Sequence, residues 1–157
     1  MEEISVENRA ELEKRYKTTV FIVSAQILSA VFLSIAAFFI TRTARPAAEN
    51  SYLTLWLVIL FLAMVTFVLR RLLFNWERLK NAALLKGVPG LLNTLRINTI
   101  FLNLFGEIII VIGFVIAFLN ADFFDMLRAA GVAVIVFALN FPRFSIWEKI
   151  VSNLEKV

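Results

Sequence analysis

The sequence predicts an all-α integral membrane protein with four transmembrane helices and amphipathic extensions at the membrane surface. Apolar residues make up 61% of the chain, well above the roughly 45–50% that is usual in soluble domains. The mean hydropathy is +0.84, and the apolar residues gather in four stretches close to the roughly 20 residues of helix that cross a bilayer core. We therefore expect a single four-helix transmembrane domain over residues 1–157.

The four expected spans differ in the charges they carry. They cover residues of about 18–41, 52–70, 97–119 and 123–141. The first has no charge and exceeds the roughly 7–15 apolar residues of a signal peptide, so we expect it to be retained. The third carries only Glu107. The fourth is interrupted early by Asp125 and Arg128, whose i,i+3 spacing lets them pair on one side of a helix.

Amphipathic stretches flank the spans at about residues 5–17, 70–86 and 143–155. In the first, Asn8 and Glu11 have the spacing of a capping box that starts a helix leading into the first span. In the second, an apolar stripe predicts that the second span continues as one helix to about Lys86, before a stop signal at Gly87. This helix is expected to lie on anionic headgroups or to dock onto a partner or sister subunit. The third stretch repeats the pattern after Pro142.

The Lys and Arg residues are distributed unevenly over the loops and termini. Thirteen of the 16 lie in the N-terminal segment, in the loop between the second and third spans, or in the C-terminal tail. In membrane proteins the cytoplasmic loops carry the excess of Lys and Arg. We therefore expect a multi-pass protein of the bacterial inner (cytoplasmic) membrane with both the N- and C-termini in the cytoplasm.

Composition excludes several kinds of functional site. The chain has no Cys and no His, so it offers no disulfide, thiolate zinc site, axial histidine, cysteine nucleophile or Ser-His-Asp triad. The net charge is +4, but the basic residues flank apolar spans and do not interleave with exposed aromatic residues as in nucleic-acid-binding proteins. The sequence predicts no enzymatic activity, cofactor, metal or nucleic-acid partner. The expected partners are the lipid bilayer and either further copies of the chain or a larger membrane complex.

Glu107 stands inside the apolar stretch NLFGEIIIVIGFVIAF (103–118), where insertion scales assign an acidic side chain roughly 2.5–3.5 kcal/mol. Asn103 lies one helical turn away on the same face. An exposed carboxylate in lipid is costly, and burial disfavours the charged form. We therefore expect Glu107 to be buried between helices and neutral at pH 7.

The first span offers polar partners at a matching depth. At 1.5 Å per helical residue, Gln26 and Ser29 lie about 12–17 Å from the expected membrane boundary, and Glu107 lies about 15 Å from it. Gln26 is the first candidate to hydrogen-bond Glu107, and Asn103 is the second. Three roles for the carboxyl group stay open: it fixes helix packing, it binds a proton or a cation, or it pairs with a partner protein.

Small residues recur at the spacing that permits close helix contacts. Gly106 and Gly113 form such a seam on the third span, and the first span carries the pairs Ala25–Ser29 and Ala30–Ser34. Small side chains let the backbones of neighbouring helices approach closely in a membrane. Both spans are therefore expected to pack tightly on a neighbour.

The stretch at 103–118, preceded by a basic loop containing Pro89 and by another span, resembles the carboxylate-bearing second helix of ATP synthase c-subunits and related proteolipids. That resemblance implies a hairpin of the second and third spans with Glu107 as the matched carboxylate. The second span has no glycine, whereas a tight c-type ring needs a glycine ladder. The whole chain, from EKRYKTTVFIVSAQ to the FPR at 141–143, also resembles a group of small bacterial four-span membrane proteins, which implies a fold and no particular activity.

Two functions are compatible with the sequence. In the first, the chain is a small polytopic subunit or accessory protein of a bacterial membrane assembly and associates with itself. In the alternative, it is a small oligomeric proton or cation transporter or channel that uses Glu107. The first is favoured, because no second acid or histidine continues a proton relay and the second and fourth spans offer few polar residues.

Overall fold

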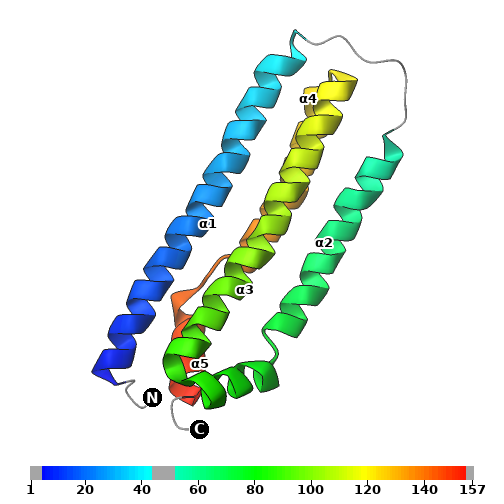
Figure 1. The fold of residues 1–157 in the computed structure, drawn as a ribbon. Helices are drawn as coiled ribbons and strands as arrows, with labels where there is room; N and C mark the ends of the chain where they lie inside the picture. Colours follow the sequence, from blue (N-terminus) through cyan, green and yellow to red (C-terminus); the bar gives the residue numbers. More distant parts are fainter. Residues whose placement is uncertain (1–4, 44–51, 155–157) are drawn as a thin grey trace.

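Four long helices run side by side, and a short fifth helix lies at one end of the bundle (Figure 1). The computed structural model describes residues 5–43 and 52–154, and every regular element in these ranges is a helix. In chain order they are α1 (Val6–Thr41), α2 (Leu53–Leu73), α3 (Trp76–Asn120), α4 (Phe123–Asn140) and α5 (Phe144–Leu154). Four segments are long and apolar enough to cross a membrane. The predicted all-α, four-helix membrane fold is confirmed, and the chain is a multi-pass membrane protein.

Helix α3 occupies the centre of this arrangement. In Figure 1 it lies in front of α4, with α1 on one side and α2 on the other. Within the described residues α1 and α2 do not touch each other, whereas α3 packs against every other helix. The start of α1, the end of α2 and the whole of α5 lie at the same end of the bundle, which we call the α5 end.

Helix α1 begins earlier than the capping-box spacing predicted. Ser5 is the N-cap, and its side chain accepts a hydrogen bond from the backbone N–H of Asn8 at 3.4 Å. The predicted capping box of Asn8 and Glu11 is therefore wrong, and Glu11 instead forms an ion pair with Arg15 one turn later. As predicted, the helix continues without a break through the first span to Thr41.

The second span does not continue as one helix to Lys86, contrary to the prediction. Helix α2 ends at Leu73, and Asn75 then caps a new helix by accepting a hydrogen bond from the Glu77 N–H at 3.0 Å. Asn is a favoured N-cap because its short side chain reaches the first free N–H groups of a helix. The apolar stripe runs on across this break, so periodicity alone did not reveal it.

Gly87 divides α3 into two parts. Its backbone has φ 66°, a left-handed conformation that glycine adopts without a steric penalty. Pro89 follows in the first turn of the next part, where a missing N–H breaks no helical bond. Residues 76–86 lie across the α5 end, and the second part turns into the bundle (Figure 1). The stop signal is therefore present as a kink, and the helix that contains the third span begins directly after it.

Buried apolar side chains form two separate clusters. The spanning cluster lies among α1, α2, α3 and α4 and consists of Ala30, Ala37, Ile59, Ile109, Ile110, Ile116, Ala117, Met126, Ala129, Ala133, Val136 and Phe137. The basal cluster lies at the α5 end and consists of Leu12, Leu79, Leu91, Leu92, Leu95, Trp147, Val151 and Leu154.

The basal cluster changes the interpretation of the amphipathic stretches. Each of the three contributes buried residues to it, for example Leu12, Leu79 and Trp147. The first and third stripes therefore pack on each other and on the start of the third span, whereas in the second stripe Leu79 is buried and Leu72 and Trp76 are exposed. The sequence had suggested headgroups or a partner as the surface that they contact. Residue 155, the last of the third stretch, lies outside the described residues.

The small-residue seam of the third span packs against α4. A Cβ atom at Gly113 would clash with the Cβ of Ala129, and one at Gly106 would come within 2.9 Å of the Phe137 ring. The two helices are thus closer than larger side chains would allow, in agreement with the prediction.

Near the start of α4, a polar group of side chains joins this helix to the end of α3. Arg128 and Asp125 form the predicted ion pair, with 3.0 Å between Nη1 and Oδ1. The second carboxylate oxygen of Asp125 accepts a hydrogen bond from Asn120 Nδ2 at 2.6 Å. The buried Asp125 carboxylate thus has a cation and an amide donor, so the charges that weakened the fourth span in the sequence are compensated locally.

Candidate functional site

Glu107 lies at the rim of a groove between α1 and α3. The groove has a volume of about 360 Å³ and is lined by apolar side chains together with Ser29 and Glu107. The Glu107 side chain is half-buried, so the expected burial between helices is only partial. The reason is its place on the helix surface: Gly106 and Ile110 face the bundle and are buried, whereas Ile108 is exposed. Residue 107 falls on the edge between these two faces.

Gln26 of α1 reaches this carboxyl group, as predicted. Its Nε2 donates a hydrogen bond to Glu107 Oε2 at 3.4 Å, which is long for an N–H···O bond. The amide oxygen of Gln26 is buried and has no hydrogen-bond partner among the described residues. Gln26 and Glu107 therefore share one weak hydrogen bond, and the amide oxygen of Gln26 remains without a donor.

The two small-residue pairs of α1 have different surroundings. Ala30 is buried, and the hydroxyl of Ser34 donates to the Ala30 carbonyl at 2.9 Å. Ala25 and Ser29 are both exposed. Ser29 lines the groove beside Glu107, but no hydrogen bond joins the two side chains within the described part of the chain. One pair is thus used inside the bundle, and the other faces outward next to the carboxyl group.

Asn103 is not a partner of Glu107, so this part of the prediction is wrong. Its side chain is fully buried, and its Nδ2 donates to the backbone carbonyls of Thr99 at 2.8 Å and Asn140 at 3.3 Å. Residues four apart differ by about 40° around a helix. That difference is enough to turn Asn103 toward α4 while Glu107 stays beside α1.

Two other buried asparagines, for which the sequence predicted no role, stabilise the ends of α2 and α4. Asn98 Nδ2 donates to the carbonyl of Leu73 at 3.0 Å and so satisfies a carbonyl at the end of α2, which has no intrahelical partner. Asn140 Nδ2 donates to the Val136 carbonyl at 2.9 Å. Their signal in the sequence was their position in apolar spans, where an amide must find a hydrogen bond to offset its desolvation.

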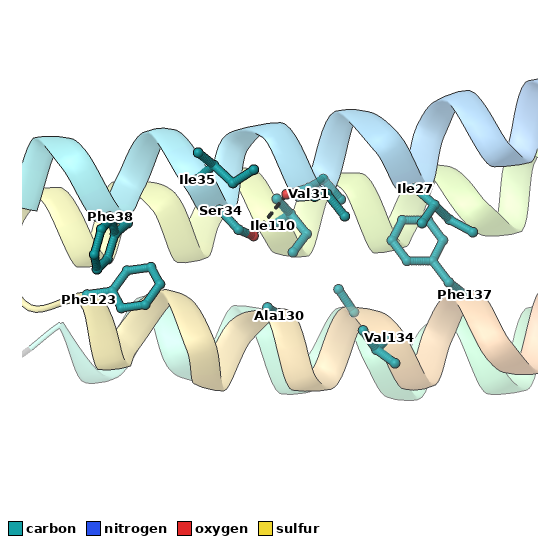
Figure 2. A pocket seen from close by; sticks show the side chains of 12 residues that line it. Ile27, Val31, Ser34, Ile35, Phe38, Ile110, Phe123, Ala130, Val134 and Phe137 are labelled. Carbon is teal, nitrogen blue, oxygen red and sulfur yellow. Dashed lines mark hydrogen bonds between the residues drawn. The ribbon is translucent and has the colours of Figure 1, made fainter.

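A second groove, between α1 and α4, has a different character (Figure 2). Its volume is about 350 Å³, and Figure 2 shows Phe38 and Phe123 toward one end and Phe137 toward the other. Among the side chains that line it, Ser34 is the single polar one, and its hydroxyl is already bonded within α1. This groove offers contact with hydrocarbon and no polar chemistry.

The Glu107 groove thus carries one carboxyl and one hydroxyl group, and the amide of Gln26 bonds to the carboxyl group at its rim. Within residues 5–43 and 52–154, no group of three or more His, Cys, Asp or Glu side chains is placed to hold a metal ion. The three groups can share a proton, bind a monovalent cation through their oxygens, or meet a polar group of another protein. No protein-family model, curated protein or solved structure matches the chain.

Proposed function

We propose that the chain is a small polytopic subunit or accessory protein of a bacterial membrane assembly, and that it associates with copies of itself through the face of α1 and α3 that carries Glu107. The observation that carries this proposal is the half-buried Glu107 at the rim of an open groove, next to the exposed pair Ala25 and Ser29. A polar rim beside small residues is the composition typical of contacts between membrane helices.

The free-energy cost of a carboxyl group that faces lipid favours coverage of the Glu107 groove by another protein chain. A carboxyl group that faces lipid with one hydrogen bond at 3.4 Å is poorly compensated, because hydrocarbon supplies no further donor or acceptor. A second copy would remove Glu107 and Ser29 from lipid and bring further polar groups to the Glu107 carboxyl group. Helix α2 lacks these features: its outer face presents large side chains such as Phe61 and Met64, which are 61% and 68% exposed, and such a face suits lipid.

Cross-linking tests this interface directly. The chain has no Cys, so one introduced thiol reports on one position. Ala25→Cys in proteoliposomes should form disulfide-linked dimers on mild oxidation, because copies with the same orientation bring residue 25 together at the same depth. Phe61→Cys on the exposed face of α2 is the control and should cross-link weakly. Equal yields at both positions, or no dimer with Ala25→Cys, would rule out this interface.

Substitutions of Glu107 separate a structural contact from a titrating site. Glu107→Gln keeps the shape and most of the hydrogen bonding, so assembly should be unchanged. Glu107→Leu leaves the Gln26 amide unpaired and should weaken packing or association by about 1–3 kcal/mol, measured as the stability and the dimer fraction in detergent. If Leu is tolerated as well as Gln, Glu107 has no role in the contact.

A proton or cation site is the second candidate, and the free amide oxygen of Gln26 beside Glu107 favours it. The nitrogen of this amide faces Glu107, and the two ends of an amide can exchange places by a rotation of the side chain. With the amide turned over, the Gln26 oxygen accepts from a protonated carboxyl group or coordinates a monovalent cation together with the carboxylate. Glu107→Gln should then keep assembly and abolish pH-dependent or Na⁺-dependent flux in proteoliposomes. Absence of any such flux from the unmodified protein would remove this candidate and leave the first.

The proposed location is the bacterial cytoplasmic membrane with both termini in the cytoplasm. The support is the clustering of Lys and Arg in three segments, together with the common position of the start of α1 and of α5 at one end of the bundle. Reporter fusions after Ala47 and after Val157 should fall on opposite sides of the membrane. A periplasmic reporter after Val157 would reverse the orientation.

A further inference from the structure

A pocket at the α5 end lies where α2 ends and where α4 passes into α5. Its volume is about 210 Å³, and the polar residues Arg70, Thr99, Asn140 and Arg143 line it together with apolar ones such as Phe74 and Ile146. It is separate from the Glu107 groove and shares none of its lining residues. The pocket is therefore a second candidate site.

Two arginine side chains converge on this pocket without a counter-charge. Arg70 belongs to the last turn of α2 and Arg143 directly precedes α5. Within the described part of the chain neither forms an ion pair, although Arg9, Arg15 and Arg128 each do. Arg143 also lies at the N-terminal end of α5, where the helix dipole favours a negative group. Two free guanidinium groups at one pocket attract an anion, and their fork geometry suits a phosphate.

Asn140 gives independent evidence for a ligand. Its side chain is 7% exposed, and its Nδ2 donates to the Val136 carbonyl, which fixes the orientation of the amide. The remaining oxygen, Oδ1, is buried and has no hydrogen-bond partner among the described residues. A buried amide oxygen normally accepts a hydrogen bond, and Asn140 is one of the residues that line the pocket, so a donor bound there would satisfy this oxygen.

The position of the pocket indicates where the ligand comes from. Arg70 and Arg143 stand just past the apolar parts of α2 and α4, at the level where long basic side chains reach lipid headgroups. Apolar side chains complete the lining, as a site for the glycerol and first acyl carbons of a lipid requires. A hydroxyl donor fits Asn140 better than an ammonium group, because an ammonium would be repelled by the two nearby arginines.

We propose that this pocket binds the headgroup of an anionic glycerophospholipid that carries free hydroxyl groups. The phosphate lies between Arg70 and Arg143, and a headgroup hydroxyl donates to Oδ1 of Asn140. The bound lipid connects the end of α2 to the α4–α5 junction. This site is independent of the self-association proposed above.

Lipid retention by the full chain in native mass spectrometry tests the proposal. The probes are phosphatidylglycerol, phosphatidylmethanol, which has the same charge and no headgroup hydroxyl, and zwitterionic phosphatidylcholine. The unmodified protein should retain phosphatidylglycerol better than phosphatidylmethanol and both better than phosphatidylcholine. Equal retention of phosphatidylglycerol and phosphatidylmethanol would overturn the role of Asn140, and this comparison needs no variant that has to fold.

Variants then locate the site. Arg70→Gln and Arg143→Gln should each weaken phosphatidylglycerol binding about tenfold or more, as expected for a lost charge-assisted bond. Arg71→Gln, on an exposed neighbour that does not line the pocket, is the matched control and should change binding little. An equal loss with Arg71→Gln would show that only general surface charge attracts the lipid. Displacement of the lipid by soluble glycerol 3-phosphate would assign the pocket to a free phosphate and refute the lipid.

Discussion

The basal and spanning clusters hold the same chain together in different ways. The basal cluster is closed: α1, α3 and α5 enclose it, and Trp147 at its centre is 2% exposed. In the spanning cluster α1 and α2 do not meet, and α2 buries only Ile59 and Thr66 among its described residues. The spanning helices are apolar enough to lie in lipid, where apolar faces gain little from covering one another. Apolar surface that meets water is instead stabilised by burial.

The polar residues of the spans are likewise of two kinds, buried asparagines and the half-buried Glu107. Asn98, Asn103 and Asn140 are buried and donate to backbone carbonyls of α2, α3 and α4, so they stabilise the helix ends nearest the basal cluster. Glu107 lies farther along α3, at an open groove. The three asparagines thus use their amide donors for packing, although Asn140 keeps an unbonded oxygen, whereas Glu107 lies at an open groove.

The largest expected effect comes from opening the basal cluster. Trp147→Ala removes a buried ring that packs edge-on against Tyr16, with 5.9 Å between ring centroids. The loss of buried area and the cavity should destabilise the fold by about 3–5 kcal/mol, measured by denaturant unfolding in mild detergent. Trp76→Ala is the control because Trp76 is 47% exposed. Similar losses for both variants would mean that the basal cluster is not a true core.

A smaller effect is expected from separating α3 and α4 in the spanning cluster. Gly113→Ala places a methyl group against the Cβ of Ala129, and overpacking of this kind costs about 1–3 kcal/mol. At Gly131 an added Cβ meets no atom within 4 Å, so Gly131→Ala should be neutral or stabilise the helix by up to about 1 kcal/mol. The unfolding midpoints of the two variants give the comparison, and equal midpoints would contradict the close approach of α3 and α4.

Asn98 tests the boundary between the two clusters. Asn98→Ala removes the donor to the Leu73 carbonyl and should cost about 0.5–1.5 kcal/mol. Faster amide exchange in the last turn of α2 should accompany the loss. Asn93→Ala on the exposed surface of α3 serves as the control. If α2 exchanges equally in both variants, Asn98 does not hold the end of α2.

The smallest effect concerns the charged surface of α1. The hydrogen bond from Arg15 lowers the pKa of Glu11 below its usual value. A lowered folded-state pKa adds stability at pH values above the ordinary carboxyl range, and this stability is lost as the pH falls through the folded-state pKa. The melting temperature of the unmodified chain should therefore slightly exceed that of Glu11→Gln at pH 7 and equal it in acid. A difference in melting temperature that increases as the pH falls would contradict this prediction.

Local patterns predicted much of the fold because they depend on residues close together in the chain. Apolar composition and length located the four spans, and the i,i+3 spacing of Asp125 and Arg128 predicted their ion pair. Matching depth on two helices that run in the same direction predicted the bond from Gln26 to Glu107. Features that depend on a single residue were harder to predict. The helix break at Asn75 depends on one capping side chain, and the apolar stripe continues across it without a change in period.

The sequence by itself determined the fold class, the spans, the amphipathic stripes and the residue types able to form a site, since each is set by hydrophobicity and by the helical period. Only the tertiary structure decided which surface each stripe covers. A period of 3.6 residues tells which side chains share a face and not which neighbour that face meets. For this reason the sequence predicted the apolar stripes but not the residues of the basal cluster that they contact. The sequence likewise placed Asn103 near Glu107, whereas in the structure its side chain turns toward α4. The pocket of Arg70, Asn140 and Arg143 likewise exists only because three helix ends meet.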